Sequence, residues 1–304
     1  MKKILNALHS HGSRLDKRVL VLSTCWVAGW VWLNYRFGLD ARVNGLPSLP
    51  LRFLARYAIS LAAWAVPYLL FSLVGGRTYL RQPVFLSLVL AAPAVFALKM
   101  SVITRLPLAP DPAWNIYWNQ VLYWPLRALL VIVPLLAAWK CLFRAQPFFG
   151  LTARGISWTP YLLMLACMIP LIALAATRPD FQASYPKLDT VDHALRQARP
   201  RWAYAGLFEL AYGSDFFTIE LFFRGFLVLA LARWAGPDAI LAMACFYCTI
   251  HFGKPLGECI SSYFGGYLLG IVIYETGSLL GGLVVHLGIA WLMELAGAGM
   301  HILK

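Results

Sequence analysis

Four ionisable side chains stand inside apolar stretches of this sequence, where charged residues are otherwise rare. Glu220 and Arg224 lie one helical turn apart within the run 216–225, in the favourable order of acid before base on one helix face. His251 and His286 stand alone in two later apolar segments. Ionisable groups at bilayer depth are costly and usually mark function. An ion pair that holds two helices together would explain the first two residues, but the two histidines that follow favour a reactive site.

A carboxylate with two histidines is a combination that can hydrolyse an amide bond. A carboxylate in a dry cavity can take a proton from water, and a histidine can donate to the oxygen that becomes negative. Glu220, His251 and His286 could instead hold a divalent metal, such as zinc, that polarises the water; this metal is compatible with the residues but not required by them. Arg224 is expected to orient Glu220, because an unpaired buried charge is destabilising.

The composition of the chain predicts the environment of these residues. Hydrophobic residues make up 61% and charged residues 13% of the chain, against roughly 25% charged residues in soluble domains. Long apolar runs without period-2 alternation lie at about 18–36, 54–76, 82–104, 113–139, 156–177, 204–234, 238–252, 259–275 and 277–296. Pro125 and Arg127 interrupt one of them, which predicts a kinked span or an interfacial helix leading into a span. We therefore expect an all-α, polytopic integral membrane protein with about eight or nine transmembrane helices.

We expect the basic residues behind the net charge of +13 to interact with membrane lipids rather than with nucleic acid. Lysines and arginines stand singly or in pairs at the ends of apolar runs, as interfacial anchors do, and no basic face carries interleaved aromatic residues. A basic N-terminus without a signal-peptide cleavage site predicts a retained first span, a cytoplasmic N-terminus and a multi-pass protein of a cytoplasmic (inner) membrane. The residues concerned are Lys2, Lys3, Arg14, Lys17 and Arg18. With nine spans His251 would face the outer side of the membrane, and with eight spans it would face the cytoplasm.

Polarity divides the chain into three parts. Residues 1–177 contain three of the 13 acidic residues and are expected to form a scaffold of transmembrane helices. Residues 178–203 are a hydrophilic connecting loop, in which 188–199 could form a short amphipathic surface helix. Residues 204–304 contain both membrane histidines and are expected to form the four-helix unit that carries the site.

In order and spacing, these residues resemble the CPBP family of intramembrane proteases, also called the Abi family and related to the CAAX prenyl endopeptidases. The family pattern is E-E-x-x-x-R, then F-x-x-x-H, then H-x-x-x-N or H-x-x-x-D, on successive helices. The resemblance covers about residues 204–296. It implies an intramembrane endopeptidase, glutamic or metallo, that hydrolyses a membrane-anchored peptide or protein. The residues that match the family motifs are Glu220, Arg224, His251 and His286.

Two positions depart from the family pattern. Ile219 stands where the family has its first Glu, which is thought to activate the water, and Ala290 stands where the family has Asn or Asp. Tyr247 replaces the Phe of the second motif, a milder change. The departures support a second interpretation, a catalytically inactive CPBP-like scaffold or regulator that binds a membrane protein partner. A transporter is a weaker interpretation, because the sequence shows no duplicated halves.

Other carboxylates could replace the missing one. Asp215 stands one turn before the first departure, and Glu258 follows the turn after His251, which makes Glu258 the preferred candidate for the site. Glu294 could replace the polar group lost at Ala290. Each also has an ordinary interpretation: a helix N-cap for Asp215, an exposed helix-start carboxylate for Glu258 and an interfacial residue for Glu294.

Overall fold

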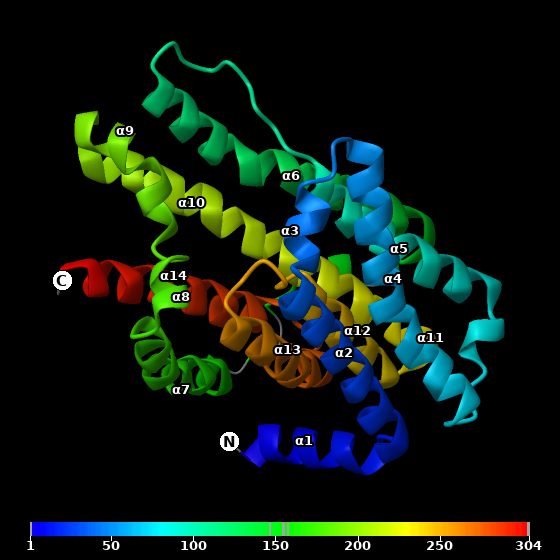
Figure 1. The fold of residues 1–304 in the computed structure, drawn as a ribbon. Helices are drawn as coiled ribbons and strands as arrows, with labels where there is room; N and C mark the ends of the chain where they lie inside the picture. The colour runs from blue at the N-terminus through cyan, green and yellow to red at the C-terminus, as the bar shows by residue number, and fades with distance from the viewer. Residues whose placement is uncertain (1, 146, 154–155, 157, 303–304) are drawn as a thin grey trace.

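The computed structural model is a bundle of helices, and the residues that it describes (2–145, 147–153, 156 and 158–302) include no strand (Figure 1). Among these described residues, six helices are long and apolar enough to cross a membrane: α4 (Leu49–Leu73), α5 (Pro83–Ser101), α6 (Pro112–Leu142), α7 (Trp158–Ala176), α13 (Leu256–Thr276) and α14 (Leu280–Ile302). Two further helices of comparable length are not among these six, α2 (Lys17–Phe37) and α10 (Arg201–Glu220). The all-α, polytopic class is confirmed, whereas the count of eight or nine spans is not established by the six.

Shorter helices connect the long ones: α1 (Lys2–Arg14), α3 (Leu39–Asn44), α8 (Pro179–Gln182), α9 (Asp192–Gln197), α11 (Ala232–Ala235) and α12 (Asp238–Thr249). Three 3₁₀ turns lie at Tyr79–Arg81, Phe148–Gly150 and Lys187–Val191. The polar connection 178–203 thus contains α8, one 3₁₀ turn and α9, and α9 lies inside the stretch predicted to be helical. This connection contacts α14 through α8 and contacts α6 and α10 through α9 (Figure 1).

Local sequence explains where helices begin, end and continue. Asp16 caps α2 by accepting a hydrogen bond from the Arg18 amide, and Gly38 ends α2 in the left-handed conformation with a φ of 63°. Pro125 and Pro134 lie inside α6, which is nevertheless one continuous helix of 31 residues. Membrane helices tolerate such prolines because neighbouring groups satisfy the freed carbonyls. The interrupted run is therefore one continuous helix that is long and apolar enough to cross a membrane.

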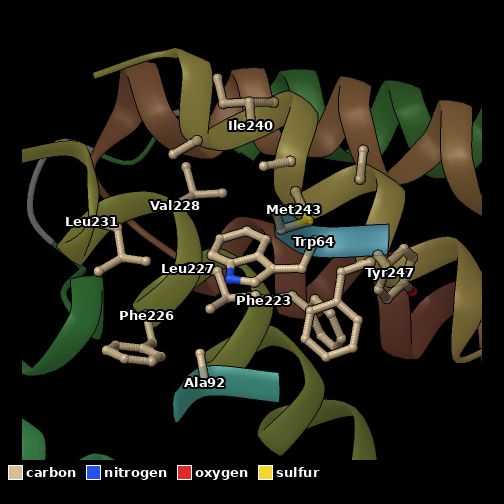
Figure 2. Packing of buried hydrophobic residues seen from close by; sticks show 14 of the residues in the cluster. Trp64, Ala92, Phe223, Phe226, Leu227, Val228, Leu231, Ile240, Met243 and Tyr247 are labelled. Atoms are coloured by element: carbon tan, nitrogen blue, oxygen red, sulfur yellow. The ribbon is translucent and has the colours of Figure 1, made fainter. Parts of the chain in front are cut away.

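The short helix α12 is the buried centre of the fold. All twelve of its residues are buried, and it packs against α4, α13 and α2. Figure 2 shows Trp64 of α4, Met243 of α12 and Ala92 of α5 in this core. Phe223, from the segment 221–230, packs beside them. Large rings such as that of Trp64 bury a large apolar area. Packing on all sides fixes the end of α12, from which the second sequence motif projects.

The apolar run 204–234 consists of three segments rather than one helix. After α10, a π-helical segment covers Leu221–Ala230, and α11 follows it. The Leu231 amide donates to the Phe226 carbonyl five residues earlier, at 3.3 Å. Turns of this width are rare and frequently lie at functional sites. The π-helical segment contains the arginine of the first sequence motif.

Candidate active site

Glu220 is the centre of a buried polar cluster built from three elements. Its Oε1 atom accepts from Nη1 of Arg224 at 3.0 Å and from Nδ1 of His286 at 2.8 Å. Glu220 is 0% exposed and Arg224 is 1% exposed. These residues come from the end of α10, the π-helical segment and α14, so one carboxylate oxygen joins three segments. The structure thus brings together three of the residues that the sequence motifs single out.

Tyr247 connects this cluster to the second histidine. Its hydroxyl lies 3.1 Å from Nε2 of His286, and its backbone carbonyl lies 3.0 Å from Nδ1 of His251. The Arg224 guanidinium stands over the Tyr247 ring, 4.1 Å from the centroid. The sequence motif indicates an aromatic residue here, but only a tyrosine hydroxyl can form the bond to His286. The sequence motif identified Tyr247 only as a change of aromatic residue and did not predict its hydrogen bond to His286. Its position four residues before His251, on the same helix face, could have indicated that it belongs to the site.

The hydrogen bonds determine which ring nitrogen of each histidine carries the proton. A carboxylate and a carbonyl only accept, so Nδ1 donates in both rings. In the neutral form, Nε2 of each ring is then an acceptor. His286 uses this atom to accept from the Tyr247 hydroxyl, whereas Nε2 of His251 makes no hydrogen bond with any described residue. Nε2 of the neutral His251 ring is therefore an acceptor.

Two glycines allow α13 and α14 to approach the cluster closely. A Cβ atom at Gly282 would lie 2.9 Å from Oε2 of Glu220 and would also collide with Ile273. A Cβ atom at Gly266 would lie 2.7 Å from the Tyr247 ring. Side chains at these two positions would push the helices away, so the glycines are part of the site's architecture.

Comparison with known proteins identifies the segment that contains this site. Residues 202–292 match the family model described as type II CAAX prenyl endopeptidase Rce1-like. This match agrees with the resemblance to the CPBP family that the motifs carry over about residues 204–296, and we call residues 202–292 the Rce1-like segment. No curated protein and no solved structure matches the chain significantly. The Rce1-like segment begins at the start of α10 and ends within α14, and it includes the whole cluster around Glu220.

At the two departures from the family pattern, the Rce1-like segment is apolar and buried. Ile219 is 9% exposed and belongs to the main hydrophobic core, and Ala290 is 4% exposed. Among the described residues, no hydrogen bond or ion pair joins Asp215, Glu258 or Glu294 to either histidine. The structure therefore brings none of the three candidate replacements into direct contact with the site.

Each of the three carboxylates has other partners. Asp215 pairs with the buried ammonium of Lys99 at 2.6 Å and lies inside α10, so it is not an N-cap. Glu258, in the first turn of α13, accepts from the Tyr185 hydroxyl at 3.0 Å. Glu294 is 6% exposed and accepts from the Lys187 amide at 2.8 Å. Lys99, Tyr185 and Lys187 lie outside the Rce1-like match, whereas Lys254, which lies 3.5 Å from Oε1 of Glu258, belongs to it.

The residues present do not fit a metal site. In the part of the chain that the structure describes, no group of three or more His, Cys, Asp or Glu side chains is arranged to hold a metal ion. Oε1 of Glu220 is already shared between Arg224 and His286, and Nε2 of His286 is engaged by Tyr247. We therefore derive no chemistry through a metal.

Proposed function

We propose that the protein is an intramembrane endopeptidase that hydrolyses a membrane-anchored peptide or protein, with His251 as the general base. The observation that carries the proposal is the bond from Nδ1 of His251 to the Tyr247 carbonyl, which leaves Nε2 as an open acceptor. A water held at Nε2 can lose a proton to it as the water attacks the scissile carbonyl. This assignment needs no carboxylate at Ile219.

In the same proposal, the Tyr247 hydroxyl stabilises the oxyanion that forms on the scissile carbonyl. When His286 is protonated, its Nε2 donates to the Tyr247 oxygen, so the hydroxyl hydrogen is free to donate to the developing oxyanion. Glu220 stabilises that imidazolium through Nδ1 at 2.8 Å, and the Arg224 guanidinium over the ring adds positive potential. In this scheme His251 takes a proton from the attacking water and returns it to the amide nitrogen as the C–N bond breaks. Tyr247 donates a hydrogen bond to the oxyanion, while Glu220 and Arg224 are positioning residues.

Purified protein in liposomes, with a farnesylated peptide that ends in a CAAX sequence, tests this proposal. The match to CAAX prenyl endopeptidase-like proteins motivates this substrate class. His251→Ala should lower the cleavage rate by about 10²- to 10⁴-fold. Tyr247→Phe keeps the ring that supports Arg224 but loses the hydroxyl, and should lower the rate by about 10²- to 10³-fold. His193→Ala, at an exposed position of α9, is the matched control and should cleave normally. Undiminished cleavage by both site variants would refute the mechanism.

A second candidate function is a catalytically inactive relative that binds a membrane protein partner. The burial of Ile219 in the core supports this alternative, because the family's water-activating position is closed by an apolar side chain. It predicts that the wild-type protein cleaves none of a panel of membrane-anchored peptides. It also predicts that His251→Ala and Tyr247→Phe preserve the cellular phenotype, so loss of the phenotype with folding intact would contradict it.

A further inference from the structure

His251 stands just beyond the end of a helix, in a turn whose backbone is not held by the helix itself. α12 ends at Thr249, and residues 250–254 form a turn before α13 begins. Carbonyl groups at the end of a helix lack the amide partner that the next turn would supply. Among the described residues, no backbone amide donates to the Phe252 or the Lys254 carbonyl. The placement of His251 therefore depends on other partners of this turn.

Two consecutive side chains of α2, which packs beside α12 (Figure 1), supply these partners. Nδ2 of Asn34 donates to the Phe252 carbonyl at 2.9 Å, and the Tyr35 hydroxyl donates to the Lys254 carbonyl at 2.6 Å. Asn34 is 3% exposed, so its bond is shielded from water. Both bonds join α2 to the Rce1-like segment, which begins only at residue 202. We call Asn34 and Tyr35 the α2 clamp.

The other end of the Asn34 amide is held as well. Its Oδ1 atom accepts from the Asp40 amide, in the first turn of α3, at 3.0 Å. Such an amide has no partner within its own helix. The Asp40 carboxylate pairs with Arg56 of α4 at 3.2 Å. A Cβ atom at Gly253 would lie 2.9 Å from Oδ2 of Asp40, so the turn also packs directly against this carboxylate.

This arrangement fixes one position of the turn. The Asn34 amide uses its donor end on one partner and its acceptor end on the other, so a flipped amide would lose both bonds. A buried carbonyl that loses its donor is destabilised, and the turn would move to recover a partner. A displacement of about 1 Å in a catalytic group can lower a rate by about 10²-fold.

We propose that Asn34 and Tyr35 are positioning residues that hold the His251 turn in its working position. This inference rests on the proposed function, in which Nε2 of His251 takes a proton from water. The Tyr247 carbonyl holds the ring of His251, while α2 holds the backbone of the turn that follows. The N-terminal helices thus complete the site of the Rce1-like segment.

Hydrogen–deuterium exchange of the full-length protein in phosphatidylcholine nanodiscs tests the α2 clamp without relying on cleavage. Tyr35→Phe removes only the hydroxyl, and Asn34→Leu removes both amide bonds at similar volume. Each should accelerate exchange of the amides of residues 251–254 by about tenfold. Exchange in α14 should stay at the wild-type level, which shows that each variant is folded. Unchanged exchange of the turn in both variants would overturn the inference.

Two matched controls remove the same kinds of bond elsewhere. The Tyr57 hydroxyl donates to the Leu90 carbonyl at 2.9 Å, and Nδ2 of Asn119 donates to the Leu106 carbonyl at 2.8 Å. Tyr57→Phe and Asn119→Leu should leave exchange of residues 251–254 at the wild-type rate. Acceleration as large as in the clamp variants would indicate a general loosening of the protein and would count against the clamp.

Kinetics separate positioning from stability. In the liposome cleavage assay, Tyr35→Phe should lower kcat by about 3- to 10-fold and Asn34→Leu by about 10- to 100-fold. KM should stay close to wild type, because a displaced base weakens the transition state and not the binding of substrate. Accelerated exchange of the turn with an unchanged kcat would overturn the positioning role.

A double variant asks whether the α2 clamp acts through His251. When Tyr35→Phe is added to His251→Ala, the residual rate should fall by less than about twofold, because the base that the clamp positions is already gone. An additional loss as large as in wild type would contradict the inference. If the wild-type protein cleaves nothing while the clamp variants still accelerate exchange, the protease is refuted and the α2 clamp stands.

Discussion

The buried pair of Glu220 and Arg224 gives a prediction whose size follows from its surroundings. Arg224→Met keeps much of the side-chain volume but removes the guanidinium that lies 3.0 Å from the Glu220 carboxylate and over the Tyr247 ring. Glu220 is 0% exposed, so its charge would be held by His286 alone. Breaking a buried pair by removing one partner costs about 3–5 kcal/mol, and we expect this variant to lie near the lower end because the histidine bond remains.

The companion variant separates charge from packing. Adding Glu220→Gln to Arg224→Met removes the orphaned charge, so the double variant should be at least about 1 kcal/mol more stable than Arg224→Met alone. Equilibrium unfolding in mixed detergent micelles measures both values. Arg201→Met is the control, because its ion pair with Asp192 spans 3.2 Å at the surface and should contribute less than about 1 kcal/mol. A double variant that is as unstable as the sum of the two single variants would refute the reasoning.

Two further predictions concern the neighbours of the site. Gly297→Ala should destabilise the protein by about 1–3 kcal/mol and increase proteolysis between residues 178 and 200, because the new Cβ would lie 2.6 Å from the Tyr185 backbone. Gly299→Ala, with nothing within 4 Å, should match wild type in both assays, and equal behaviour of the two variants would contradict the packing argument. Ile219→Glu should raise peptide cleavage by about tenfold or more, since it adds a carboxylate next to the site; an unchanged rate would argue against a productive position there.

Much of the fold follows from the apolar pattern of the sequence. The predicted segments correspond to helices of the structure, and the ends of α2 lie at the cap Asp16 and at Gly38. The pattern could not reveal the π-helical segment, because the apolar run 204–234 is compatible with an α-helix as well as with a π-helix. It also could not establish how many helices span the membrane, since length and hydropathy do not separate a span from a buried or interfacial helix.

The site was predictable where it depends on spacing along one helix, and unpredictable where it depends on distant partners. Helical geometry places Glu220 and Arg224 on one face, and the structure joins them. Asp215 pairs with Lys99, more than one hundred residues earlier in the chain, and Glu258 accepts from the distant Tyr185 in addition to its local ion pair with Lys254. Contacts of this kind leave no local pattern in a single sequence. For this reason the candidate replacement carboxylates looked available in the sequence and are paired in the structure.

The shortness of α12 has a consequence for how water would reach the site in the proposed hydrolysis. Twelve residues of α-helix extend only about 18 Å, whereas the hydrocarbon layer is about 30 Å thick. If α12 ran along the membrane normal with the Asp238–Arg77 ion pair at one surface, His251 at the other end of the helix would lie roughly 10 Å below the opposite surface. Hydrolysis there requires a hydrated funnel or a locally thinned membrane. The rate of the proposed hydrolysis should then depend on lipid chain length, because a thicker bilayer would reduce the access of water to His251.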